Sequence, residues 1–184
     1  MVAYGGAAKE WYEQADAFCA AVVGKTAKEV DALVGEDGKA SDDIITAGCT
    51  IGASDFVKAV SEAVENAVEC KGATADSKLQ VGVVSAQAEC KDATADAEGL
   101  NEIDTTVAAA VVGADGKVIA INTDALQAKF SFDAAGACTA EAGEIKTKND
   151  LGDAYGMVAY GGAAKEWYEQ ADAFEGLCAG KTAT

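Results

Sequence analysis

The chain has 184 residues and a formal net charge of −17, and it contains no Arg, His or Pro, so all 14 basic residues are Lys. Without His it cannot form a Ser–His or Cys–His dyad or an imidazole metal site, and without Arg it has no bidentate clamp for phosphate or carboxylate. The negative charge repels nucleic acid and anionic lipid, so neither is expected as a partner.

The first third of the chain is predicted to be helical. A first helix from Lys9 to Val23 is indicated because apolar residues recur at helical spacing, and Gly24 ends it. Thr26 and Glu29 have the spacing of a capping box, which predicts a short helix over Ala27–Val34, followed by a loop over residues 35–43. A third helix is expected from about Asp55 to Cys70, and its apolar stripe consists of Phe56, Val60, Ala63, Val64 and Ala67.

The second part of the chain is predicted to form strands. Runs rich in Val, Ile and Phe occupy Leu79–Ala88, Ile103–Val112, Lys117–Ala125 and about Lys129–Phe132. Asp115-Gly116 is a hairpin signal, and Asp133–Gly136 is a second turn. Short turns favour antiparallel pairing, so the predicted fold class is α+β, an antiparallel β-meander sheet with helices packed on one face. A short helical turn is expected at Thr147–Asp150, and from Ala163 the first helix is repeated.

An identical segment stands near each end of the chain. The eighteen residues Met1–Phe18 recur unchanged as Met157–Phe174, a period of 156 residues, and residues 24–27 recur as 180–183. The chain is therefore divided into a helical half (1–77), an antiparallel sheet half (78–146) and a repeated start of the helical half (147–184). A shorter repeat relates Glu69–Asp76 to Glu89–Asp96, a spacing that could place Cys70 and Cys90 at one end of an intervening strand.

The cysteines indicate disulfides more than metal or redox chemistry. No pair has C-x-x-C spacing and no His completes a mixed site, which argues against zinc and thioredoxin-type functions. An even number in an acidic chain fits disulfides in an oxidising compartment, with buried free thiols as the alternative. The pairing is left open among 15 combinations. The disulfide candidates are Cys19, Cys49, Cys70, Cys90, Cys138 and Cys178.

Three further patterns are candidates for binding or catalytic sites. Gly176–Thr182 resembles a phosphate loop but is one residue short and follows a helix, so its second glycine is interpreted as a helix cap. Asp92–Gly99 resembles a calcium loop, but Thr94 and Thr105 occupy the two charged anchor positions. Carboxylates are too abundant to single out an acid–base pair. We therefore expect no catalytic residue, no metal site and no cofactor.

Several stretches together resemble one family. They are Thr147–Met157, Lys9–Phe18 with Lys165–Phe174, Val23–Val30, Cys90–Leu100, and the Asp-Gly-Lys hairpin followed by Phe132–Gly136. The group consists of secreted or lipid-anchored surface proteins of anaerobic Gram-positive bacteria that carry the module once or in tandem. The resemblance implies an extracellular or cell-surface location and brings no catalytic residues. The chain departs from it in being permuted, and in having Cys49, Cys90 and Cys138 where the module has ordinary residues.

Two functions follow as hypotheses. The first is a non-enzymatic extracellular structural subunit that self-associates through its duplicated terminal helices, as a dimer, polymer or filament that disulfides could lock. The aromatic residues expected at its contacts are Trp11, Phe18, Trp167 and Phe174. The alternative is a module that binds a small ligand such as a flavin, between the Asp115–Lys117 hairpin and the Gly-rich segment Tyr155–Gly162. No apolar run reaches the about 18 residues of a membrane span, and no signal-peptide pattern opens the sequence, so membrane insertion is not expected.

Overall fold

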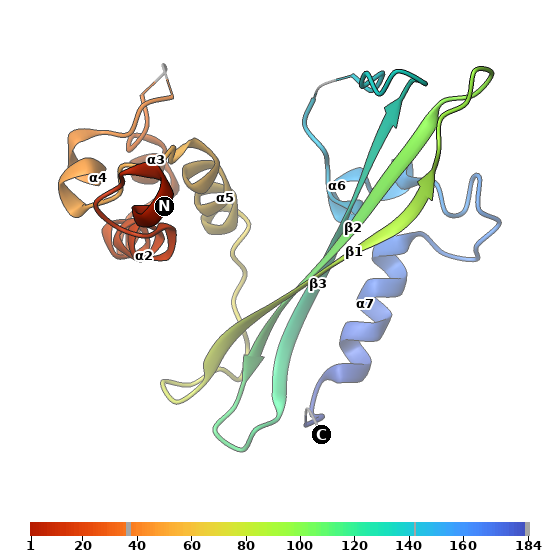
Figure 1. The fold of residues 1–184 in the computed structure, drawn as a ribbon. Helices are drawn as coiled ribbons and strands as arrows, with labels where there is room; N and C mark the ends of the chain where they lie inside the picture. Colours follow the sequence, from red (N-terminus) through yellow and green to blue (C-terminus); the bar gives the residue numbers. More distant parts are fainter. Residues whose placement is uncertain (36–37, 142, 183–184) are drawn as a thin grey trace. The chain divides into compact units, whose positions relative to one another are not determined.

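The chain folds as two units, which are described separately. The computed structural model describes residues 1–35, 38–141 and 143–182 and divides the chain into Met1–Glu69 and Cys70–Thr184 (Figure 1). The first unit is helical, and the second contains a sheet with helices. Residues 36 and 37 of the predicted loop and residue 183 of the repeat lie outside the described part.

The described residues of the first unit form five helices, in the order α1 (Val2–Gly5), α2 (Trp11–Val22), α3 (Ala27–Asp31), α4 (Asp42–Ala47) and α5 (Ser54–Glu65). The capping box predicted from Thr26 and Glu29 is confirmed: the Thr26 side chain accepts from the Glu29 N–H while the Glu29 carboxylate accepts from the Thr26 N–H. Helix α2 packs on α4, and α3 packs on α5. Their buried side chains are Phe18, Val30, Leu33, Ile44, Cys49, Ala53 and Val57.

Three details of the first unit differ from the prediction. Helix α4 was not predicted: it begins at Asp42, in the last two residues of the predicted loop, and continues past it to bury Ile44 fully; a helix this short has too few residues to show a period. Helix α5 buries Val57 and Ser61 and only partly buries Phe56 and Val60, because contact with α3 selects its face. It also ends at Glu65 instead of Cys70; Val68 beyond it is 88% exposed, so no burial stabilises another turn.

The second unit is built on a three-stranded antiparallel sheet. Its strands β1 (Lys78–Lys91), β2 (Gly99–Val112) and β3 (Val118–Phe132) are adjacent in chain order. The predicted α+β class with an antiparallel meander is confirmed. The two runs Lys117–Ala125 and Lys129–Phe132 form one strand, β3, rather than two, since residues 126–128 between them continue the pairing with β2. Both predicted turns are present: Gly116 has φ +78°, and the Asp133 carboxylate accepts from two following N–H groups.

Helices cover part of one face of this sheet. The chain continues into α6 (Lys148–Leu151), the 3₁₀ turn η1 (Gly152–Tyr155) and α7 (Trp167–Cys178), and α6 and α7 both pack on β3 (Figure 1). The Thr147 side chain caps α6 by accepting from the Asp150 N–H, as the sequence predicted. After α7 the chain pairs with the edge of β3 through the Val118 N–H to Lys181 O bond. Among the described residues, none of the helices combines the length and the hydropathy that crossing a membrane requires.

The shorter internal repeat does not bring its cysteines together. Gly72, two residues after Cys70, lies against Ile119 at the end of the sheet where β1 begins. Cys90 lies in β1 twelve residues after Lys78, which at the rise of a strand is about 40 Å away. The predicted neighbourhood of Cys70 and Cys90 is therefore wrong, because a long strand separates the two copies of the repeat instead of returning to its start.

Candidate self-association site

The two copies of the duplicated segment have the same local structure. In the first, the Glu10 carboxylate accepts from the Met1 ammonium at 2.7 Å and from the Val2 N–H at 3.1 Å. In the second, the Glu166 carboxylate accepts from the N–H groups of Met157 and Val158 at 2.9 and 3.0 Å. Each helix then opens with a capping box, in which Glu13 or Glu169 accepts from the N–H of the capping Glu. The segment therefore fixes its own turn and helix, independently of what it packs against.

The first copy packs through Gln14 and Phe18. The Gln14 side chain is 1% exposed, and its Oε1 accepts from the Thr50 N–H at 2.8 Å and from the Thr50 hydroxyl at 2.9 Å. Phe18 is 2% exposed, and its ring centroid lies 5.4 Å from that of Phe56. Trp11 remains 53% exposed, although its ring packs edge-to-face with that of Phe56, with 5.7 Å between the ring centroids. One face of α2 is thus committed to the helical core.

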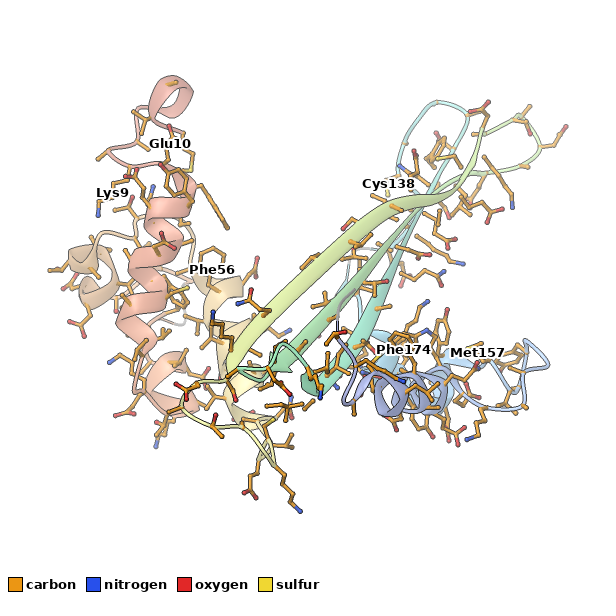
Figure 2. All side chains as sticks on the ribbon, turned by 90° about the horizontal axis from the view of Figure 1, so that it is seen from below. Lys9, Glu10, Phe56, Cys138, Met157 and Phe174 are labelled. Carbon is orange, nitrogen blue, oxygen red and sulfur yellow. The ribbon has the colours of Figure 1, made fainter. Side chains whose placement is uncertain are left out.

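The second copy packs through a different face. On α7 it is Ala171 that is buried, at 9% exposure, with Trp167 half-buried beside it. One turn further on, the Glu175 carboxylate accepts from the N–H and the hydroxyl of Thr123 in β3, at 2.5 and 2.8 Å. Phe174, the counterpart of Phe18, is 56% exposed. Figure 2 labels it on α7.

The face that α2 buries is therefore exposed on α7, while Ala15, the counterpart of the buried Ala171, is half-buried on α2. Gln14 and Phe18 are buried on α2, whereas their counterparts Gln170 and Phe174 are exposed on α7. The residues used on the sheet, Ala171 and Glu175, directly follow these two in sequence. Successive helical residues are about 100° apart around the axis, so the two faces are neighbours and not alternatives for the same surface. A single helix of this sequence can bury both faces at once.

Charged groups around the second copy tie it to the turn that precedes it. The Tyr168 hydroxyl donates to the Asp153 carboxylate at 3.1 Å, and this bond raises the pKa of Tyr168. The Lys148 ammonium lies over the rings of Tyr155 and Trp167, at 4.9 and 5.7 Å from their centroids. These contacts orient α7 on its own sheet, where Gln170 and Phe174 line an open hollow of about 400 Å³ beside Thr106 and Thr123.

The six cysteines are free thiols in the structure. Cys49 is buried, Cys70 and Cys178 are half-buried, and Cys19, Cys90 and Cys138 are exposed. The disulfides remain a prediction, for which the exposed thiols are the accessible candidates.

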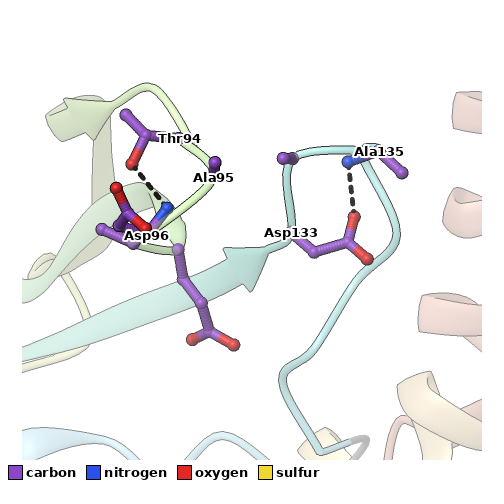
Figure 3. A pocket seen from close by; sticks show the side chains of 8 residues that line it. Thr94, Ala95, Asp96, Asp133 and Ala135 are labelled. Carbon is purple, nitrogen blue, oxygen red and sulfur yellow. Dashed lines mark hydrogen bonds between the residues drawn. The ribbon is translucent and has the colours of Figure 1, made fainter.

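The acidic turns at one end of the sheet form a shallow hollow of about 440 Å³. Figure 3 shows two of its polar side chains turned to their own backbone: Thr94 accepts from the Asp96 N–H, and Asp133 accepts from the Ala135 N–H. The segment Asp92–Gly99 joins β1 to β2, so it is not the loop between two helices that a calcium-loop alignment requires. Within the described part of the chain, no cluster of His, Cys, Asp or Glu fits a metal ion.

The other two ligand patterns also have structural roles. In Gly176–Thr182, residues 176–178 belong to α7, and Gly180 after it has φ +77° and donates to Val118 O, which agrees with the interpretation of that glycine as a helix-ending residue. The hairpin at Asp115–Lys117 lies beside Thr182, past the end of α7. Met157 lies beside Trp167 and Thr123, near the start of α7. The twelve residues of α7, about 18 Å, separate the two parts of the proposed flavin pocket.

The sheet leaves apolar side chains exposed along its first strand. Leu79, Val81 and Val83 are 65%, 61% and 61% exposed, and their register partners in β2 place them on the face opposite to Thr106 and Thr123, where α7 packs. An edge strand with an exposed apolar row is a surface that favours association.

Comparison with protein-family models, curated proteins and solved structures finds no match to this chain. The resemblance to surface proteins of anaerobic bacteria thus remains a prediction.

Of the four aromatic residues expected at contacts between chains, Phe18 lies in the core of its own unit, Trp11 and Phe174 are more than half exposed, and Trp167 is half-buried. The sequence interpretation missed Gln14 and Glu175. Residue 175 carries a signal, since it is the first position at which the two copies differ.

Proposed function

We propose that the chain is a non-enzymatic structural subunit that self-associates through its duplicated helix segments, at the cell surface or outside the cell. The observation that carries the proposal is the complementary burial of the two copies, in which Phe18 is 2% exposed and Phe174 is 56% exposed. A helix that buries both faces needs a sheet on one side and a helical unit on the other. Each copy has only one of these within its own unit, so contact between chains supplies the other.

Exposed apolar residues support the same proposal. Phe174 and Leu177 are 56% and 73% exposed on α7, and a further apolar row lies on β1. Surfaces of this kind are typical of subunits that bury them on assembly.

Sedimentation velocity over a concentration series tests this function. In reducing buffer we expect species larger than the 18.5 kDa chain that grow with protein concentration. A strict monomer at every concentration, both reduced and oxidised, would contradict the proposal. Electrophoresis without reductant separately tests whether the exposed thiols Cys19, Cys90 and Cys138 add covalent links.

A further inference from the structure

The site that α2 fills in the helical unit recognises two side chains. Phe18 enters a core formed with Val30, Ile44 and Val57, and Gln14 meets the backbone and side chain of Thr50. Both of these side chains recur in α7 at the same spacing, on a helix with the same cap and the same preceding turn. There they are exposed.

From this match we infer that α7 of one copy occupies, in a second copy of the chain, the site that α2 fills in the structure. Gln170 would then accept the two Thr50 bonds, and Phe174 would take the place of Phe18. The inference rests on the proposed self-association and adds its geometry: the donor is α7, and the acceptor is the helical unit of another chain.

The residues after the identical segment set the direction of the exchange. The sheet requires Glu175, whose carboxylate accepts two bonds from Thr123, whereas α2 carries Cys19 at that position and offers no such acceptor. Helix α2 is therefore a poor substitute for α7 on the sheet.

The helical unit, in contrast, accepts the sequence of α7. The positions of Glu175 and Gly176 correspond to Cys19 and Ala20, which are both exposed on α2. Leu177 and Cys178 correspond to Ala21 and Val22, which pack against the core as apolar residues. Leu177 is larger than Ala21, so the acceptor site must make room for it at a partly buried position.

Ala171 and Glu175, which hold α7 on the sheet, lie about 100° around the helix from Gln170 and Phe174. Gln170 and Phe174 line an open hollow of about 400 Å³ with Thr106 and Thr123 of the sheet, so insertion turns these two side chains out of the hollow while the Glu175 bonds to Thr123 stay in place. One helix thus bridges the sheet of its own chain and the helical unit of the next. Every chain has one donor helix and one acceptor site of different structure, which is a heterologous contact and gives an open head-to-tail polymer.

Helix α2 competes for the same site within its own chain. The two competitors are identical through Phe18, so their contacts are similar, and the tethered α2 has an effective concentration on the order of millimolar. Replacement of α2 by α7 of another chain therefore depends on protein concentration, and it increases when the packing of α2 in its own unit is weakened.

Sedimentation velocity of four full-length variants in reducing buffer tests the inference. Phe174→Glu removes the donor side chain at an exposed position and should weaken association about 10- to 100-fold. Gly176→Glu is its matched control, because position 176 is exposed and its counterpart Ala20 is also exposed; it should associate like the unmodified chain. Phe18→Glu opens the acceptor site and should increase association, whereas the double variant Phe18→Glu with Phe174→Glu should remain monomeric.

The outcomes separate the inference from the function on which it rests. If Phe18→Glu and the double variant associate equally, association comes from an unfolded helical unit and the exchange is wrong. If the unmodified chain associates and Phe174→Glu does not change it, the chain self-associates through another surface and the inference alone fails. If neither the unmodified chain nor Phe18→Glu associates at any concentration, the proposed function fails as well.

Discussion

The same substitution in the two identical segments should have very different effects. Phe18→Ala removes a side chain that is 2% exposed in the helical core, while Phe174→Ala removes one that is 56% exposed on α7. The substituted residue, the eight residues before it and the helix cap are the same in both copies, so the difference comes mainly from packing.

The magnitudes follow from burial. A buried Phe→Ala change costs about 3–5 kcal/mol through lost transfer free energy and the cavity left behind. The first unit extends from Met1 to Glu69, and a unit of that size has a total stability of about 3–10 kcal/mol, so Phe18→Ala removes a large part of it. Less than half of Phe174 is shielded from water, and no closed cavity forms at an exposed position, so Phe174→Ala should cost the second unit about 1 kcal/mol.

The two tryptophans provide the assay, because Trp11 lies in the first unit and Trp167 in the second. Guanidinium unfolding followed by fluorescence reads the first unit in a Trp167→Phe background and the second in a Trp11→Phe background, at a concentration where the chain is monomeric. Equal losses of unfolding free energy for the two Phe→Ala changes would refute the assignment of different faces to the two copies.

Four further predictions follow from the same contacts. Gln14→Ala should destabilise the first unit by about 1–3 kcal/mol because the Thr50 N–H loses its acceptor. Gln170→Ala should change the unfolding free energy of the second unit by no more than about 0.5 kcal/mol. The same unfolding assay measures both. Glu175→Cys should destabilise the second unit by about 1–3 kcal/mol and speed hydrogen exchange at the Thr123 amide, because Thr123 loses its acceptor. Cys19→Glu should leave the unfolding free energy of the first unit unchanged. Unaltered exchange at Thr123 in Glu175→Cys would contradict the role of Glu175. The bond to Asp153 raises the pKa of Tyr168, so the bond is complete below the ordinary tyrosine pKa and is lost as the pH rises through the raised pKa. Ultraviolet titration should show a tyrosine with a raised pKa, and this pKa should return to the ordinary range in Asp153→Asn. A tyrosine pKa that stays raised in this variant would rule out the bond as its cause. Raising the ionic strength from about 0.1 M to about 1 M shortens the Debye length from about 10 Å to about 3 Å. Because each chain carries a net charge of −17, screening of their mutual repulsion should strengthen association. Weaker association at high salt would show that attractive charge pairs dominate the contact.

The periodic and capped parts of the fold could be predicted from the sequence. The Thr26–Glu29 box, the Asp115-Gly116 hairpin and the Thr147 cap each depend on a few neighbouring residues, and all three are present. Local chemistry decides such features, so a single sequence contains the necessary information.

Features that depend on distant contacts could not be predicted in this way. Helix α5 turns Val57 to the core because α3 lies there, and α4 forms because Ile44 reaches the same core. The duplicated segment is the clearest case, since identical residues cannot reveal that one copy packs through Phe18 and the other through Ala171. Only the difference between Cys19 and Glu175 marks which copy belongs on the sheet.

A cross-link from α7 to the neighbouring chain tests the central claim most directly. A diazirine amino acid of leucine size at Leu177, which is 73% exposed, would lie where Ala21 packs against the helical core. When isotopically light and heavy chains are mixed, the account predicts light–heavy cross-links from position 177 to peptides within residues 27–65. Cross-links confined to chains of one isotope, or light–heavy cross-links only to sheet peptides, would contradict it.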